Sequence, residues 1–466
     1  MRSKINRQSE INFHPSNLQV TNEYYEKYEA VSTILDENPK ILDLVHEDIK
    51  VDLESLSSSD GSGGTFRYTS DNVLRMVMCQ IIESRSLRET IIRIDDSNFL
   101  RQFVRICNGP MMDFTTLCRL KNAIAPKTWK KVNEALARYA VRNELIEGGQ
   151  LRMDTTAVET NIHYPTDSWL LWDTYRVLDS LIERVREIDT RCVGSRRLHT
   201  KRAKKAYATI SRKASKKPGN QEKLKPYYER LIEQVTGICQ WADDICKDVN
   251  RRLPRRGSTG LISTLADEIA SYLRLGLHVI DQASRRVLDG EQVPNDQKLF
   301  SLFESHTELL KRGKAGKPIE YGHMIQIQQV ESKFITAYDV FDKKPNEYTL
   351  VEPALARHKE LFGFYPDSIA ADKGYYESMG AIEKLNKKIK IVSIAKKGKR
   401  TEDEKLRESD PEFRFAQRFR AGAEGSISYL KRILGLFRCF TKGWEHYVST
   451  VAATIFTHNV LVLARE

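Results

Sequence analysis

Hydrophobic and polar positions alternate in two ways along the C-terminal part of the chain. Short apolar runs there are typical of strands, and they lie at 150–155, 321–330, 333–340, 368–372 and 390–395. Apolar residues that recur every three or four positions predict helices at 350–362 and 378–387, then a helix around Glu424 and a terminal apolar helix. Strands and helices in this order predict an α/β fold, with a mixed sheet covered by helices on both faces.

A long and almost wholly helical stretch, about residues 169–315, interrupts this pattern after the first strand. In its middle, apolar residues follow alternating spacings of three and four, at Tyr228, Leu231, Val235, Ile238, Ala242, Ile245 and Val249. Such a seam predicts a helical hairpin or bundle within the chain. It could serve a dimer as readily.

The N-terminal part is predicted to be a group of short helices. Ser86-Leu-Arg-Glu89 is a capping-box pattern that begins one helix, and Asp113 could begin another. With Arg119 and Lys121 nearby, these helices could form a helix-turn-helix unit that contacts DNA. An ordinary helical domain with solvated lysines explains the same pattern equally well.

These patterns divide the chain into four parts. We expect a helical lead-in with a Gly/Ser linker at 1–65, a helical N-terminal DNA-binding domain at 66–146, a catalytic domain at 147–168 and 316–466, and a helical insertion domain at 169–315.

Composition narrows the class of protein. The chain has 466 residues, of which 40% are hydrophobic and 30% charged, and its net charge of +12 suits a polyanionic partner. Its seven cysteines include no CxxC pair, which argues against a disulfide framework or a zinc site and fits a reducing cytosol. The polar first ten residues and the lack of a long apolar run predict neither a signal peptide nor a membrane span.

A basic run lies within the helical insertion. Ten lysines and arginines fall between residues 196 and 217 without one acidic residue, and they include Arg196, Arg197, Lys201, Arg202, Lys204 and Lys205. A run of this density favours contact with phosphates, although a solvated helix face is the ordinary explanation of a charge run.

Three acids in different contexts form the candidate catalytic set. Asp154 and Asp372 end strand-like runs, and Glu424 lies in a helical run with Arg420 four residues before it and Lys431 seven after, on one face. Carboxylates from elements that meet in space suit two Mg²⁺ ions acting on a phosphodiester. Taken singly, each aspartate could be a turn residue, and the Arg420–Glu424 pair a surface salt bridge.

At these residues the sequence resembles the DDE transposases of bacterial insertion sequences. Asp372-Lys-Gly-Tyr375 matches the family's second-aspartate motif, Asp-x-Gly-Tyr/Phe, and Arg420, Glu424 and Lys431 match its third-acid signature. Two positions depart from the pattern. Gln417 replaces the tyrosine of the third-acid signature, and His323 lies where the family commonly has a lysine. Relatives more often carry an insertion after the second aspartate, so the role of this one does not carry over.

The resemblance implies an RNase H-like catalytic core and a helical N-terminal transposase domain. It implies cleavage of DNA at the element's ends and strand transfer into target DNA, with two Mg²⁺ ions for which Mn²⁺ can substitute. Asp154, Asp372 and Glu424 would be catalytic and hold the metal, and Arg420, Lys431 and Lys373 would contact DNA. We expect double-stranded DNA as partner, no membrane, a homodimer in the DNA complex, and a place at the nucleoid of a bacterial cytoplasm. The alternatives are a nuclease of the same fold without strand transfer and a DNA-binding protein with a decayed site.

Overall fold

A computed structural model describes residues 17–55, 68–215, 220–252, 260–311 and 318–465 of the chain. The Gly/Ser run at 57–64 and the end of the basic run, Lys216 and Lys217, lie outside these residues. By packing, the chain forms two compact units, residues 1–160 with 322–466 and residues 161–321. The four-part division expected from the sequence stays a prediction.

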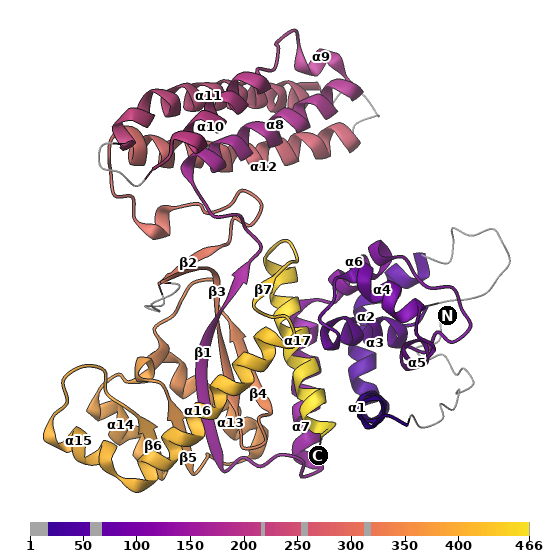
Figure 1. Cartoon of the computed structure of the whole chain (residues 1–466), viewed down its shortest axis with the longest axis vertical. Helices are drawn as coiled ribbons and strands as arrows, with labels where there is room; N and C mark the ends of the chain where they lie inside the picture. The colour runs from indigo at the N-terminus through magenta and orange to yellow at the C-terminus, as the bar shows by residue number, and fades with distance from the viewer. Residues whose placement is uncertain (1–16, 56–67, 216–219, 253–259, 312–317, 466) are drawn as a thin grey trace. The chain divides into compact units, whose positions relative to one another are not determined.

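The first unit holds the sheet, apart from β2 (Glu308–Lys311), and most of the described helices (Figure 1). Its N-terminal helices are α1 (Gln19–Asp36), α2 (Pro39–Ser55), α3 (Ser70–Ile82), α4 (Leu87–Asp95), α5 (Asn98–Phe103), α6 (Phe114–Ala123) and α7 (Pro126–Arg142). Its strands are β1 (Gln150–Thr160), β3 (Ile319–Gln329), β4 (Ile335–Val340), β5 (Ser368–Ala371), β6 (Ile391–Ile394) and β7 (Arg438–Cys439). Its other helical segments are η4 (Glu347–Leu350), α13 (Val351–Phe362), η5 (Lys373–Tyr375), α14 (Met379–Asn386), α15 (Glu402–Ser409), α16 (Pro411–Arg432) and α17 (Trp444–Leu463).

Strand β1 lies at the centre of a mixed sheet. The order among the described strands is β2-β3-β1-β5-β6, with β4 paired to β3 and β7 paired to β1. β1 runs antiparallel to β3 and parallel to β5, and β5 runs parallel to β6. This mixed sheet flanked by helices confirms the predicted RNase H-like α/β class.

The two faces of the sheet are buried against different helices. Leu151, Met153, Ile369 and Ala371 share one apolar core with α13 and α14. Residues that alternate with these along β1 and β5 point to the other face, which α16 crosses, and Figure 1 shows α16 running beside β1, β5 and β6. The sheet is therefore covered on both sides, as the alternation of apolar runs predicts.

The strand predictions hold in place but not always in length. β1 continues to Thr160, beyond the predicted end at residue 155, because pairing with β3 extends to Glu159. Sequence reasoning missed β2 (Glu308–Lys311) and β7, which are too short to show a period of two.

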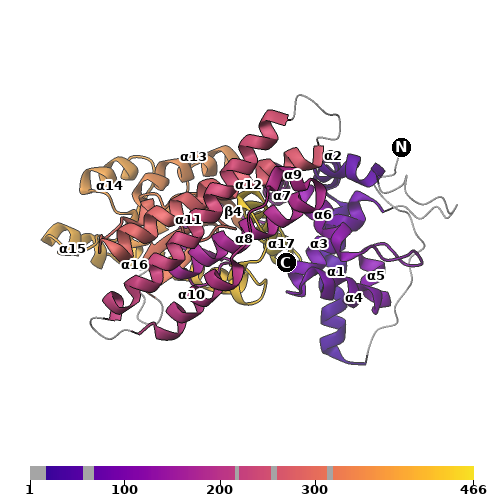
Figure 2. The same ribbon diagram turned by 90° about the horizontal axis from the view of Figure 1, so that it is seen from above.

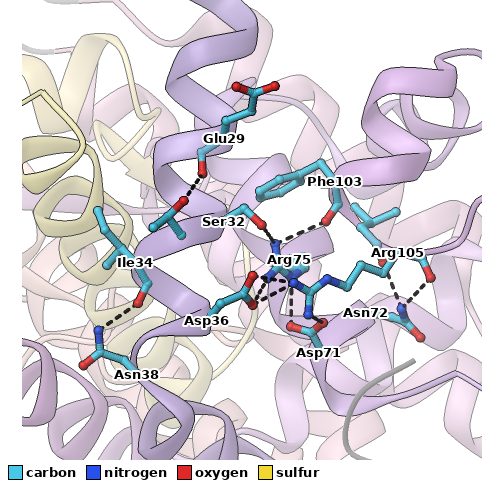
Figure 3. Close-up of polar contacts among 12 residues, drawn as sticks. Glu29, Ser32, Ile34, Asp36, Asn38, Asp71, Asn72, Arg75, Phe103 and Arg105 are labelled. Carbon is cyan, nitrogen blue, oxygen red and sulfur yellow. Dashed lines mark hydrogen bonds and ion pairs between the residues drawn. The ribbon is translucent and has the colours of Figure 1, made fainter. Parts of the chain in front are cut away.

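The seven N-terminal helices pack into one core together with α17. A buried ion network ties them together, and Figure 3 shows it: the guanidinium of Arg75, 0% exposed, donates to Asp71 (2.8 Å) and Asp36 (2.8 Å). Arg105 donates to the same two carboxylates. Since an unpaired buried charge is strongly unfavourable, this network fixes α1, α3 and the segment after α5 to one another.

Both predicted helix starts are confirmed in this region. Ser86 caps α4 in a complete capping box with Glu89, and the carboxylate of Asp113 accepts the backbone N–H of Thr115 at the start of α6. Lys121 is buried in α6 and donates to the side-chain oxygen of Gln80 (2.9 Å), so its ammonium is not available to DNA in this structure. Arg119 is exposed.

The second unit is a helical bundle. It contains α8 (Asp167–Ile188), α9 (Thr190–Val193), α10 (Thr200–Lys213), α11 (Asn220–Arg252), α12 (Gly260–Ala283), η2 (Ser284–Leu288), η3 (Asn295–Gln297) and β2. Figures 1 and 2 show α8, α10, α11 and α12 side by side. The seam of α11 is buried between these helices, so it serves the bundle inside the chain and is not open for a dimer. Among the described residues, no helix has the length and apolar character needed to span a bilayer.

Candidate active site

Asp154 and Asp372 lie at equivalent positions on neighbouring parallel strands. The pairing places Arg152 of β1 beside Ala370 of β5. Each aspartate follows two residues later, so both project from the same face of the sheet on chains that lie about 4.8 Å apart. Two acids separated by more than two hundred residues in sequence are thereby brought to one face of the sheet.

Glu424 reaches this edge from α16, which packs on β1, β5 and β6. One turn before it, Arg420 places its guanidinium between two carboxylates, 3.5 Å from Asp154 Oδ2 and 3.4 Å from Glu424 Oε1. Asp372 and Glu424 are exposed, and Asp154 lies deeper, with 9% of its surface exposed. The three predicted acids therefore converge on one site, with a cation between two of them.

The electrostatics of Asp154 reflect its burial and the charges around it. Burial, together with the charges of Asp372 and Glu424, raises the pKa of Asp154 to about 6. A hydrogen bond from the Thr155 backbone N–H and the charge of Arg420 oppose this rise in pKa. The ionised form of Asp154 is therefore disfavoured first by burial and then by two like charges, and a bound cation would stabilise it.

Sequence reasoning missed the role of Arg152 in seating α16. Its guanidinium is buried, donates to the backbone oxygen of Phe419 (2.9 Å) and lies over the Phe419 ring. A Cβ at position 422 would lie 2.2 Å from Arg152 Nη1, so Gly422 gives this contact its space. Arg152 precedes Asp154 by two residues, and it therefore fixes the helix that carries Glu424 to the strand that carries Asp154.

The contacts of Gln417 give a structural role to the glutamine that stands at the position of the family's tyrosine. Its side-chain amide donates to the backbone oxygens of Ser393 (2.5 Å) and Ala371 (3.3 Å), at the ends of β6 and β5. It thus anchors α16 to both strands one residue before Asp372. Likewise Lys431, predicted to grip phosphate, donates its ammonium to the backbone oxygen of Ala157 on β1 (2.6 Å).

The donor set suits a hard divalent cation, because it consists of carboxylate oxygens on separate elements. In the arrangement described, no group of three His, Cys, Asp or Glu residues in the described part of the chain is close enough to hold one ion. Arg420 takes the place of a cation between Asp154 and Glu424. The residues therefore fit a divalent metal by the chemistry of their oxygen donors, and the guanidinium of Arg420 occupies the place between two of them.

The cations predicted to contact DNA fall into three groups. Arg420 and Lys373 lie at the site in the first unit, Lys373 exposed beside Asp372. Arg196 forms an ion pair with Asp244 (2.8 Å). The remaining cations of the second unit are exposed and form no ion pair with a described residue: Arg197, Lys201, Arg202, Lys204 and Lys205.

Comparison with known proteins agrees with this geometry. No curated protein and no solved structure gives a significant match to the chain. Residues 296–460 match the family model of the transposase DDE domain. The matched span contains Asp372 and Glu424, and β1 adds Asp154 from outside it. Families with this domain generally use divalent metals. This match supports a DDE transposase, and it covers the C-terminal part of the chain.

Proposed function

We propose that this protein cleaves DNA at the ends of a bacterial insertion sequence and joins those ends to target DNA. The observation that supports the proposal is that Asp154 of β1, Asp372 just after β5 and Glu424 of α16 lie on the same face of the sheet. Only the fold brings these acids together, and a carboxylate site at a strand edge suits phosphodiester chemistry.

The three carboxylates would hold two divalent ions, Mg²⁺ or Mn²⁺. Bound there, the ions supply activation of the attacking oxygen and neutralisation of the leaving oxygen. In the first reaction, water attacks a phosphodiester and releases a 3′-hydroxyl at the element's end. In the second, this hydroxyl attacks a target phosphodiester, one bond forms as one breaks, and a target 3′-hydroxyl leaves.

Two side chains of the site have roles that do not depend on the bound ions. Arg420 neutralises Asp154 and Glu424 in the metal-free protein, so it keeps like charges together until a cation arrives. Once displaced, its guanidinium can pair with a backbone phosphate in a bidentate manner. Lys373, exposed next to Asp372, is placed for a second phosphate contact.

A strand-transfer assay with labelled element ends tests the proposal. Wild-type protein should give cleaved and joined products in Mg²⁺ or Mn²⁺, and Asp154→Asn, Asp372→Asn and Glu424→Gln should give neither. Cleavage without joining would favour a nuclease of the same fold. Binding of the ends without any metal-dependent product would favour a DNA-binding protein with a decayed site.

The exposed cations of α10 form a second DNA contact in this proposal. Lys201, Arg202, Lys204 and Lys205 lie within five residues of one helix, and none is neutralised by a described acid. Each phosphate contact contributes about 0.9 to the slope of log affinity against log salt. Replacing all four with glutamine should therefore reduce that slope by up to about 3.6.

A matched control is available in the same unit. Arg184 and Lys247 are exposed cations that already pair with Glu268 and Asp243. Neutralising these two should leave the salt slope nearly unchanged. If the α10 variant also leaves it unchanged, the basic run is a solvated face and this part of the proposal is wrong.

A homodimer on DNA, a bacterial cytoplasm and a place at the nucleoid belong to the same proposal. Two element ends are joined together, which calls for two active sites in one complex. Because the α11 seam is buried within its own bundle, another surface has to make the dimer. Light scattering of the protein with and without paired element ends measures the change in oligomeric state.

A further inference from the structure

Glu347, at the start of η4, touches both chain segments that carry the first two acids. The hydroxyl of Thr155 donates to Glu347 Oε1 over 2.7 Å. Thr155 follows Asp154 in β1, and successive residues of a strand point to opposite faces. Glu347 therefore approaches from the face of the sheet opposite to the three acids.

The second contact of Glu347 is with the turn after Asp372. A Cβ at position 374 would lie 1.7 Å from Glu347 Oε2, so any side chain there would displace the Glu347 carboxylate. Gly374 does not have a positive φ, so its backbone conformation would suit other residues. The glycine of the Asp372-Lys-Gly-Tyr375 motif thus leaves the space that the Glu347 carboxylate occupies, and its backbone conformation does not require glycine.

Two further polar residues extend this layer beneath the site. Tyr375, 2% exposed, accepts a hydrogen bond from the side-chain amide of Gln326 (3.4 Å). Gln326 lies directly opposite Thr155 in the pairing of β1 with β3. The layer therefore reaches from β3 through β1 to η5, and it links the segments on which Asp154 and Asp372 lie.

We propose that Glu347 is a positioning residue that fixes Asp154 and Asp372 relative to each other. It holds the Thr155 hydroxyl with one carboxylate oxygen and packs the other against Gly374. Glu347 lies on the face of the sheet opposite to the three acids, so it does not contact the substrate and acts through the two aspartates. This inference rests on the proposed function, because its consequence is the spacing of the two metal-binding carboxylates.

Binding of Mn²⁺ alone, measured by calorimetry or by electron paramagnetic resonance, tests the inference without DNA. Substitutions that disturb the support of metal ligands typically weaken metal affinity by about 10- to 100-fold. Glu347→Ala should raise the Mn²⁺ dissociation constant by this factor. Glu347→Gln keeps an oxygen that can accept from Thr155 and should lose less. The control is Glu352→Ala, which removes an exposed glutamate of α13 that pairs with Lys388, and it should bind Mn²⁺ as wild type does.

Gly374→Ala supplies an independent arm of the test. An alanine there forces the Glu347 carboxylate away, which breaks its contact with Thr155. The single variant should therefore weaken Mn²⁺ binding about as much as Glu347→Ala, and the double variant should be no weaker than either. Thr155→Val, which keeps the shape but lacks the hydroxyl, should show the same direction of change.

The outcomes separate this inference from the proposed function. If wild type binds no Mn²⁺, or Asp154→Asn binds it equally well, the proposed metal site fails. If wild type binds Mn²⁺ and loses it on Asp154→Asn, but folded Glu347→Ala and Thr155→Val bind it normally, the positioning role is refuted. Additive losses for Glu347→Ala and Gly374→Ala would also refute it, because they would mean that the two residues act separately.

Discussion

Asp154→Asn should make the metal-free protein inactive and at the same time more stable. Burial and two neighbouring carboxylates raise the pKa of Asp154 to about 6 from its ordinary value of 3.8. At neutral pH the folded protein therefore holds this carboxylate ionised at a cost in free energy. Asparagine removes the charge, and its side-chain oxygen can still accept the backbone N–H of Thr155.

The magnitude and the pH window follow from the two pKa values. At 1.36 kcal/mol per pH unit, the interval from 3.8 to about 6 corresponds to about 3 kcal/mol of unfolding free energy. Because the folded protein has the higher pKa, it binds the proton more tightly than the unfolded chain does. The penalty is absent below pH 3.8, grows as the pH rises to about 6, and is complete above it.

Denaturant unfolding of wild type and Asp154→Asn in EDTA, between pH 4 and pH 8, measures this difference. The variant should gain up to about 3 kcal/mol at pH 8 and little at pH 4. Asp372→Asn is the control, because its carboxyl is exposed and its loss should inactivate the protein with a much smaller gain in stability. A variant that is less stable than wild type at pH 8, or a gain that does not change with pH, would refute the reasoning.

Three other substitutions test how the fold supports the site. Arg75→Ala should cost up to about 3–5 kcal/mol of unfolding free energy, because buried Asp71 loses one of its two guanidinium partners and keeps only Arg105; a thermal melt within 1 °C of wild type would contradict this. Lys431→Gln should cost about 1–3 kcal/mol, since Lys431 donates to Ala157, whereas a lysine that only grips phosphate would leave the melting temperature unchanged. Gln417→Leu should cost a similar amount, about 1–3 kcal/mol, and weaken Mn²⁺ binding, and normal binding would show that Gln417 does not hold α16 at the site.

Much of the catalytic fold could be predicted because its elements are short and strongly patterned. The strands β4, β5 and β6 and the helices α13 and α14 begin and end within about two residues of their predictions. Prediction failed where polar residues or brevity hid the period, as in the second half of β1 and in β2 and β7. The full length of β1 depends on hydrogen bonds with β3, which no local pattern records.

The candidate site was predictable as a set of acids but not as a geometry. Asp154, Asp372 and Glu424 could be selected from their local contexts and their resemblance to a family. Arg152 could not, because its role depends on meeting Phe419 and Gly422 of a distant helix. The burial of Lys121 could not be predicted either. Its position in a helix suggested an exposed cation, but its ammonium is buried against Gln80.

The sequence by itself determined the chemistry of this protein: hard oxygen ligands, an excess of positive charge, and the periodicities that select strands and helices. Tertiary structure decided the rest. It set β1 beside β5 so that two aspartates share an edge, laid α16 across them so that a glutamate joins, and placed Glu347 underneath. The physical reason is that residue type fixes what a side chain can bind, whereas the distance between side chains is set by strand register and helix packing between segments far apart in the chain.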